Sequence, residues 1–424
     1  MSWTRRAWLG AAAACAAACS RTDARTLRFW AMGREGEVAA ELVAGFEREH
    51  PGVRVRVEQL PWSAAHEKLL TAVAGDATPD IAQMGNTGLA EMDALHALEP
   101  LEGLVDVQQR LPAADHFEGI WQTNQVGGRL VGVPWYVDTR LLFYRADLLR
   151  DAGHPQAPRS WAEWQAAMQA LHAGAVPHPM ILPLDEFQPL LALALQQPEP
   201  LLRDGGRRGN FDTPGFRRAL DFYVEMYRRG WAPSAGEGEF GNVAQEFGRG
   251  RFAFYITGPW YIGEFRRRLP AAMQERWNTA PLPGPDGPGM SVAGGSSLVV
   301  FRRSKLKPEA ARLIEYLCRH DVQQRFYGLT GNLPPRRSVW TQPPLSTDDK
   351  ARAFRDQLER VRPSPAVPEW ERIVQEMQLV AERIVRGRVP VPQALQALNS
   401  RTDAMLEKRR WLLDRGAGRG GAAS

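Results

Sequence analysis

Four places along the chain combine aromatic side chains with single polar groups. In chain order they are Trp62, the group Trp135, Tyr136, Asp138 and Arg140, the pair Trp260 and Tyr261 after a Gly-Pro turn, and the run Gly294, Gly295 and Ser296. A pyranose sugar has an apolar C–H face and a rim of hydroxyls. A site for it therefore needs flat aromatics beneath the ring and carboxylates, amides or arginines around it. All four places fall at expected strand ends or loops, where α/β folds build ligand clefts.

Each of these residues also has a plain structural interpretation. A tryptophan usually packs in a core, and Trp161, Trp164 and Trp231, which lie on helical patterns, fit that role better than a binding role. For Asp138 and Arg140 the alternative is that they only form an ion pair with each other at the surface. Such pairs are common and individually weak. The residue types alone leave both interpretations open.

The elements that position these residues begin with alternating strands and helices. Residues 26–30 and 53–57 alternate apolar and charged side chains as half-buried strands do. Between them, residues 37–49 place their apolar side chains on one helical face, and His50-Pro51-Gly52 ends that helix. Residues 64–74 and 79–82 then repeat the helix-strand order. This alternation predicts an α/β lobe with a largely parallel sheet.

A second lobe is expected to begin near Pro134. Its expected elements are a strand at 141–144 and helices at 161–172 and 216–229, and later segments predict a strand at 296–301 and helices at 308–327, 369–385 and 393–410. From residue 413 the tail is glycine-rich, so we expect it to be disordered. No fixed-period repeat is visible, which excludes solenoids and propellers.

Length and charge limit the function classes. A chain of 424 residues is too long for one compact core and fits two lobes. The formal charge is +5, of which Arg5 and Arg6 contribute two, and no basic stripe is interleaved with aromatics as nucleic-acid binding requires. The three cysteines form no disulfide framework or metal-spaced pair, and Cys318 is expected to be a small buried residue.

The first 20 residues have the pattern of an export signal. A basic head with Arg5 and Arg6 precedes an apolar stretch over residues 7–18, which is well below the roughly 20 residues of a membrane-spanning helix. The paired arginines are similar to a twin-arginine export motif. Small residues before Cys19 resemble a lipoprotein cleavage box, with Cys15 as a rival register and cleavage without lipid as the alternative. We expect a signal peptide over residues 1–19 and a lipid on Cys19.

Further segments, in order along nearly the whole chain, carry a family resemblance. They include residues 46–53, 132–147, 158–163, 258–261 and 330–336. Together they resemble family 1 extracellular solute-binding proteins of ABC importers, and within that family the trehalose and maltose binders. The resemblance implies a type II periplasmic-binding-protein fold of two α/β lobes that enclose ligand by closing about a hinge. We expect lobe 1 to comprise residues 26–134 plus 291–324, lobe 2 residues 135–290 plus 325–412, and a disordered tail at 413–424.

The resemblance also assigns roles to residues. It implies that Trp260 and Tyr136 stack on sugar and that Asp138 accepts from sugar hydroxyls. Glu35 and Asn86 would be polar contacts from the first lobe, although Glu35 also fits a helix first turn and Asn86 a turn. The paired glycines would let backbone approach the ligand. The remaining ligand candidates are Trp62, Trp135, Arg140, Tyr261, Ser296 and Arg337.

This sequence departs from the trehalose and maltose pattern at two positions. Ser296 stands where many such proteins have an aromatic residue, and Gly88 stands where a bulky residue is expected. Because a missing aromatic platform changes which sugar ring fits, the identity of the sugar stays open.

The resemblance implies a periplasmic, lipid-anchored monomer that binds a disaccharide or short oligosaccharide and delivers it to the permease subunits of an importer. We expect no catalysis, cofactor, metal or nucleic acid, and contact with the membrane only through the lipid. Three alternatives remain: the same scaffold binding a glycerol phosphodiester or polyamine, a glycosidase using two carboxylates, and a sensory or structural lipoprotein. A glycosidase is defined by the distance between its two catalytic carboxylates, which a sequence does not show.

Overall fold

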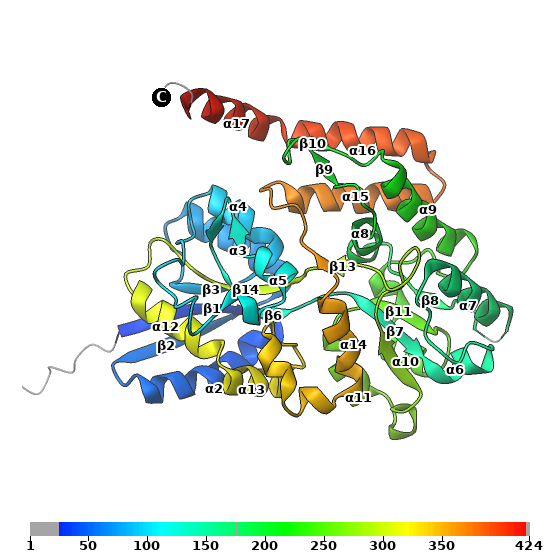
Figure 1. Cartoon of the computed structure of the whole chain (residues 1–424), viewed down its shortest axis with the longest axis horizontal. Helices are drawn as coiled ribbons and strands as arrows, with labels where there is room; N and C mark the ends of the chain where they lie inside the picture. Colours follow the sequence, from blue (N-terminus) through cyan, green and yellow to red (C-terminus); the bar gives the residue numbers. More distant parts are fainter. Residues whose placement is uncertain (1–24, 175, 421–424) are drawn as a thin grey trace, which may run out of the picture.

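The computed structural model describes residues 25–174 and 176–420, so the expected signal peptide and Cys19 lie outside the described residues. Two α/β lobes stand side by side, each built on its own sheet (Figure 1). The first sheet has the order β2-β1-β3-β14-β6 and the second the order β12-β7-β11-β8. The expected two-lobed α/β class is confirmed.

The first sheet is parallel only on one side. Its strands are β1 (Arg25–Met32), β2 (Val53–Leu60), β3 (Ile81–Gly85), β6 (Val133–Val137) and β14 (Gly295–Val300). Strand β1 pairs in parallel with β2 and β3, whereas β14 runs antiparallel to both β3 and β6. Because β6 stays in this sheet through Val137, the chain leaves the first sheet there rather than after residue 134.

Helices cover both faces of this sheet. They are α2 (Gly33–Glu49), α3 (Trp62–Ala74), α4 (Leu89–Ala94), α12 (Lys307–Leu317) and α13 (His320–Thr330). The expected single helix over 308–327 is wrong, because Arg319 adopts an extended backbone and the chain restarts as α13. The restart lets the buried amide of Gln323 donate to the carbonyls of Trp135 and Leu317. Helix α13 packs against α2, so residues 325–330 lie with the first lobe.

The second sheet consists of β7 (Leu141–Arg145), β8 (Met180–Ile181), β11 (Phe254–Thr257) and β12 (Trp277–Ala280). The helices around and beyond it are α6 (Ala146–Asp151), α7 (Trp161–Ala173), α8 (Gln188–Leu195), α9 (Pro214–Arg228), α10 (Val243–Gly248), α11 (Trp260–Arg268), α14 (Asp349–Leu358), α15 (Trp370–Val385), α16 (Val391–Met405) and α17 (Glu407–Gly420). Helix α17 continues through Gly420, into the glycine-rich tail that is expected to be disordered from residue 413. Residues 421–424 lie outside the described residues.

Shorter elements complete the chain. They are η1 (Asn86–Gly88), η2 (Ala113–Asp115), α5 (Glu118–Gln122), β4 (Gln125–Val126), β5 (Arg129–Leu130), β9 (Leu202–Arg203), β10 (Arg208–Gly209), η3 (Glu237–Phe240), η4 (Ala271–Met273), β13 (Ser291–Val292), η5 (Arg337–Thr341), η6 (Leu345–Thr347) and β15 (Val361–Arg362).

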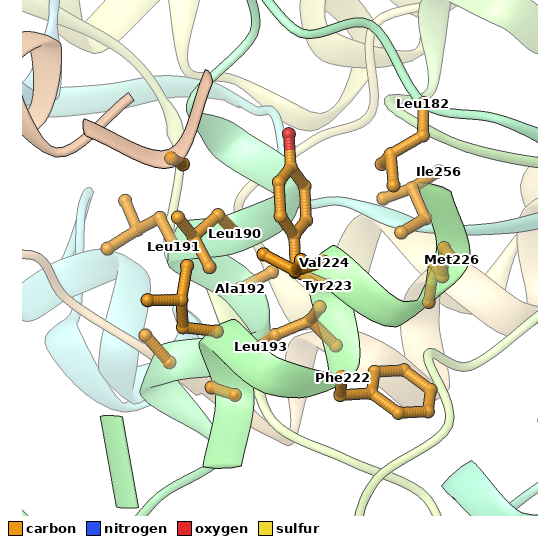
Figure 2. Close-up of a cluster of buried hydrophobic side chains, with 14 of the residues drawn as sticks. Leu182, Leu190, Leu191, Ala192, Leu193, Phe222, Tyr223, Val224, Met226 and Ile256 are labelled. Carbon is orange, nitrogen blue, oxygen red and sulfur yellow. The ribbon is translucent and has the colours of Figure 1, made fainter. Parts of the chain in front are cut away.

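Local sequence explains where the second-lobe helices begin and what they bury. Ser160 accepts from the backbone N–H of Glu163, whose carboxylate accepts from the N–H of Ser160, so a capping box starts α7. Helices α8 and α9 pack together, and Figure 2 shows Leu190 to Leu193 of α8 beside Phe222 to Met226 of α9. Leu182 and Ile256 belong to the same core. Burying these apolar side chains drives the folding of the lobe.

Two of the chain segments that cross between the lobes bind each other. After β6, the N–H of Asp138 donates to the carbonyl of Gly294 at 3.0 Å. Thr139 donates to the carbonyl of Val292, and Ser291 donates to the carbonyl of Arg140. The outgoing segment at 138–140 and the returning segment at 291–294 therefore form one bonded unit at the boundary between the two sheets.

Candidate ligand-binding site

A cavity of about 500 Å³ lies between the lobes, within the range of about 300 to 1,000 Å³ typical of ligand pockets. Both lobes line it, and so do the crossing segments. The predicted residues that it brings together are Glu35, Trp62, Asn86, Tyr136, Asp138, Trp260, Gly294, Gly295 and Ser296. They come from strand ends, helix starts and loops, which is the placement that the sequence pattern indicates.

Trp260 and Asp138 share one buried cation. The guanidinium carbon of Arg140 lies 4.6 Å from the Trp260 ring centroid, and its nitrogens bind Asp138 and, at 3.2 Å, Glu186. Arg140 is only 6% exposed and does not line the cavity. Arg140, predicted as a ligand contact, instead lies behind the cavity wall, where it holds a carboxylate and an aromatic ring that both face the cavity.

The electrostatics of Asp138 follow from this burial. Burial raises the pKa of Asp138 above its usual range, while the neighbouring Arg140 lowers it. A charge in an apolar environment is costly unless it is paired, so the guanidinium is what keeps a carboxylate acceptable at this wall. Asp138 therefore forms the ion pair with Arg140 that the sequence offered as an alternative, and it also lines the cavity.

Tyr136 and Ser296 belong to a buried hydrogen-bond network beneath the cavity. Gln83 donates to the Tyr136 hydroxyl at 3.2 Å and to Ser296 Oγ at 3.3 Å, and Ser296 Oγ donates to the Tyr136 hydroxyl at 3.2 Å. Gln83 Oε1 accepts from the backbone N–H of Met32. Burial raises the pKa of Tyr136 well above its usual value, so the phenol stays protonated. Ser296 thus fixes the orientation of Tyr136 where an aromatic side chain was expected.

Glu35 sits in the first turn of α2 and also lines the cavity, so both of its interpretations hold. Its Oε1 accepts from Asn332 Nδ2 at 2.5 Å, while the buried Oε2 has no hydrogen-bond partner among the described residues. Burial raises the pKa of Glu35 above its usual range, against the effect of hydrogen bonds that include the one from Asn332. Glu35 is therefore a buried carboxylate with an oxygen left to accept from a ligand.

Asn86 likewise combines two roles. It starts the single turn η1 after β3, and its Nδ2 donates to the carbonyl of Ala293 at 2.8 Å. This bond ties the turn to the crossing segment, while the residue lines the cavity. Its amide oxygen is an acceptor that the bond to Ala293 leaves for other partners.

The paired glycines are explained by backbone contacts. A Cβ at Gly294 would lie 2.2 Å from the carbonyl oxygen of Asp138, and one at Gly295 would lie 2.3 Å from that of Tyr136. Gly295 also has φ of +148°, which side chains rarely adopt. Both residues line the cavity, but the close approaches they allow are within the protein: Gly294 lies against the crossing segment at Asp138, and Gly295 lies against Tyr136 of β6.

Trp135, predicted as a ligand contact, lies outside the cavity lining. Its side chain is fully buried in the first lobe and stacks on Phe326, with the two ring centroids 4.6 Å apart. Strand β6 does not alternate regularly here, because its register with β14 shifts between Tyr136 and Pro134 and leaves Trp135 as the extra residue. Both Trp135 and Tyr136 lie against Phe326, and only Tyr136 also lines the cavity.

Two further residues predicted as ligand contacts also lie outside the cavity lining. Tyr261 packs edge-on against Tyr255 at 4.9 Å in the second lobe and is outside the cavity lining. Arg337 lies over the Phe117 ring at 4.6 Å and pairs with Glu359, also outside the lining.

Several lining residues carry no signal in the sequence. They are Arg34, Gly85, Thr87, Phe187, Gln188, Leu191, Val292, Asn332 and Ser364. Phe187 and Leu191 follow Glu186 at the start of α8, which looks like an ordinary apolar helix. Asn332 lies in a loop after α13, and only its distant partner Glu35 gives it a role.

Within residues 25–174 and 176–420, no helix is long and apolar enough to cross a membrane. The same residues include no group of three or more metal-ligating side chains. Cys318 is buried there, as expected, and burial raises the pKa of its thiol to about 12.

Comparison with known proteins places the fold and cavity in a family. The family described as bacterial extracellular solute-binding protein matches residues 32–324. The solved structure of the sugar-binding protein MalE from Xanthomonas citri is 53% identical, with a TM-score of 0.88 over 92% of this chain and 99% of that chain. The chain belongs to the bacterial extracellular solute-binding protein family.

Two curated relatives are also similar over most of their length. An uncharacterized lipoprotein of Streptomyces antibioticus is 30% identical over 82% of this chain and 80% of its own. The galactooligosaccharide-binding protein of Bacillus subtilis is 24% identical over 89% of this chain and 88% of its own. The family consists of binding proteins, so the scaffold is one that holds a solute.

Proposed function

We propose that this protein is the substrate-binding component of an ABC importer and that it binds a sugar in the cavity between its lobes. The observation that carries the proposal is the pairing of Trp260 with Asp138 at one wall, both held by Arg140. An aromatic face next to a carboxylate matches the apolar face and hydroxyl rim of a pyranose. The 53% identity to a sugar-binding protein over nearly the whole chain supports the same ligand class.

The finer proposal is a disaccharide or short oligosaccharide such as maltose or trehalose. The cavity has the capacity for more than a single ring, and Trp62, Tyr136 and Trp260 line it from different elements. Trp62 comes from α3, Tyr136 from β6 and Trp260 from α11. Platforms spread over both lobes suit linked rings, because each ring needs its own apolar face.

A non-sugar solute fits the lining less well. A phosphodiester favours paired arginines or an open helix N-terminus, yet Arg34 is the one arginine that lines the cavity among the described residues, and it pairs with Glu37. A polyamine favours several carboxylates without a competing cation, whereas Asp138 already binds Arg140.

The proposal also covers catalysis, location and assembly. We propose a monomer without hydrolytic activity that acts in the periplasm and passes its sugar to permease subunits. The carboxylates of Asp138 and Glu186 both bind Arg140, which leaves neither arranged as an acid across a glycosidic bond from the other. Incubation of the protein with maltose or trehalose is expected to release no glucose. Glucose formation that disappears in Asp138→Asn would contradict this part of the proposal.

The lipid anchor is proposed from the leader pattern and from the lipoprotein named among the relatives. Palmitate labelling in a bacterial host tests it. Cys19→Ser is expected to abolish the label, whereas the matched variant Cys15→Ser keeps it. The reverse result would move the anchor to Cys15, and no label in either variant or the parent would contradict lipidation.

A thermal-shift panel tests the ligand class. Maltose, trehalose, sucrose and maltotriose form one arm, and glycerophosphodiesters and putrescine form the other. We expect at least one sugar to raise the melting temperature with a concentration dependence, since a ligand that binds only the native state stabilises it. A shift with the second arm alone would contradict sugar as the ligand.

A further inference from the structure

The last helix of the chain, α17, lies at the edge of the molecule, where it extends from the end of α16 (Figure 1). The apolar cores of the lobes include none of the side chains described for α17. One side of the helix is fixed to the body. Arg410 donates to the carbonyl of Asp403 at 2.7 Å and to that of Arg207 at 3.0 Å, and Asp414 pairs with Arg207. These bonds hold α17 in place with its opposite face turned to solvent.

The solvent-facing side of α17 is apolar at its centre. Trp411 and Leu412 are 50% and 52% exposed, the highest values among the large apolar side chains of the described residues. They are adjacent in the chain, so they form one exposed apolar surface. Apolar surface in contact with water costs free energy, and a contiguous apolar patch is typical of a place where another surface binds.

Basic side chains flank this apolar centre. The residues Lys408, Trp411, Leu412 and Arg415 are spaced so that they share one face of the helix. Lys408 and Arg415 are both exposed. Arg415 lies over the Trp411 ring, with its guanidinium carbon 3.8 Å from the ring centroid. We call these four residues the outer face of α17.

The acidic residues of α17 lie off the outer face. At about 3.6 residues per turn, Glu407 and Asp414 both fall to one side of it, and Asp414 is already paired with Arg207. The outer face therefore combines apolar and positive groups without a negative one. An anionic lipid bilayer is complementary to both, because tryptophan favours the headgroup level of a membrane and lysine and arginine are attracted to acidic headgroups.

We propose that the outer face of α17 binds the surface of an anionic lipid bilayer, with the helix lying along the membrane. The proposal goes beyond the proposed function and does not depend on which solute the cavity holds. It departs from the expectation that the lipid alone touches the membrane. A protein attached by its lipid and also by α17 would keep a fixed orientation on the membrane, because a second attachment point restricts the rotation that a single one allows.

Vesicle flotation tests the proposal with the mature chain produced without its lipid. The vesicles contain either equal parts of phosphatidylglycerol and phosphatidylcholine or phosphatidylcholine alone. We expect the protein to bind the anionic vesicles at least about tenfold more strongly than the neutral ones. High salt is expected to weaken this binding, because it screens the charges. No flotation with either kind of vesicle, or equal flotation with both, would overturn the proposal.

Substitutions locate the contact. The double variant Lys408→Glu with Arg415→Glu is expected to bind anionic vesicles at least about tenfold more weakly than the parent. The matched control is Lys305→Glu with Arg355→Glu, which changes the net charge equally at exposed positions before α12 and on α14, away from α17 in Figure 1. It is expected to float as the parent does. Equal loss in both double variants, or parent-like flotation of the α17 variant, would overturn the proposal.

Trp411→Ala tests the apolar part of the outer face and is expected to weaken vesicle binding as well, because the tryptophan no longer enters the headgroup layer. Sedimentation of the same variant separates lipid from a protein partner. A dimer of the parent that Trp411→Ala dissociates would assign the outer face to a second copy of the chain and overturn the proposal. All α17 variants are expected to bind sugar as the parent does, so failure of the proposed function would leave this proposal standing.

Discussion

The guanidinium of Arg140 lies 4.6 Å from the centre of the Trp260 ring while it binds the carboxylate of Asp138. One buried cation thus orients both an aromatic face and a charged acceptor at the same cavity wall. Residues 138–140 belong to a crossing segment, whereas Trp260 starts α11 in the second lobe. Arg140 therefore links the crossing segment to the lobe that supplies the platform.

Arg140→Gln is expected to lower the free energy of unfolding by about 3 to 5 kcal/mol, because it leaves Asp138 and Glu186 largely buried without their cation. Urea unfolding measures this change. The variant is also expected to bind sugar more weakly, and its affinity should recover as pH rises. Without the cation the pKa of Asp138 rises further, so higher pH is needed to ionise it.

The double variant Arg140→Gln with Asp138→Asn is the control for this pH effect. It has no titrating group at position 138, so its affinity is expected not to recover with pH. A recovery of the same size in both variants would show that the pH effect does not arise from Asp138.

Trp260→Ala is expected to cost about 1 to 3 kcal/mol of sugar binding, because the largest platform in the second lobe is lost. Trp411→Ala is the matched control, since Trp411 is a half-exposed tryptophan on α17 that does not line the cavity. Titration calorimetry compares them. Unchanged affinity in a folded Trp260→Ala protein would remove this residue from the site.

Trp135→Ala is expected to act on stability rather than on binding. The side chain is fully buried and stacked on Phe326, so its removal should lower the free energy of unfolding by about 3 to 5 kcal/mol. Below the melting temperature, the folded protein is expected to bind sugar as the parent does. A large loss of affinity with unchanged stability would return Trp135 to the binding site.

Glu35→Gln tests the buried carboxylate through its pH dependence. The folded-state pKa of Glu35 lies above its usual value of 4.5, so its contribution to stability is present below that pH and is lost as pH rises through the raised pKa. The glutamine variant lacks this loss. Its melting temperature relative to the parent is therefore expected to increase from pH 4 to neutral pH.

The same variant is expected to bind sugar more weakly at neutral pH, because an amide oxygen is a poorer acceptor than a carboxylate. A melting-temperature difference that stays constant across the pH range would contradict a raised pKa for Glu35. The amide keeps an oxygen that can accept from Asn332, so the comparison leaves that bond in place.

The fold class and half of the residues that line the cavity could be predicted from sequence for a physical reason. Trp260, Asp138 and Gly294 stand next to turns and strand ends, where local pattern and position in an α/β fold coincide. Trp135 stacks on Phe326 outside the lining because the pairing of β6 with β14 is irregular at this residue, and the sequence does not encode that irregularity. Tyr136, one residue on, is the side chain that faces the cavity.

Other features depend on contacts between distant residues. Asn332 and Glu35 are far apart in the chain and meet only in the folded protein. The break between α12 and α13 has no proline or glycine at Arg319; it is accompanied by the bonds of Gln323 to the carbonyls of Trp135 and Leu317. The role of Arg140 likewise could not be predicted, because it depends on where the Trp260 ring lies in the folded protein. No spacing in the sequence encodes that position.

The central claim is that a sugar binds in the cavity between the lobes, and calorimetric titration of the mature protein tests it most directly. Maltose, trehalose, sucrose and maltotriose are titrated into the parent and into Asp138→Asn. The account predicts an exothermic signal of micromolar affinity or tighter for at least one sugar in the parent, and a clear weakening in the variant. A folded parent that gives no heat with any of these sugars, or a variant that binds as tightly as the parent, would contradict it.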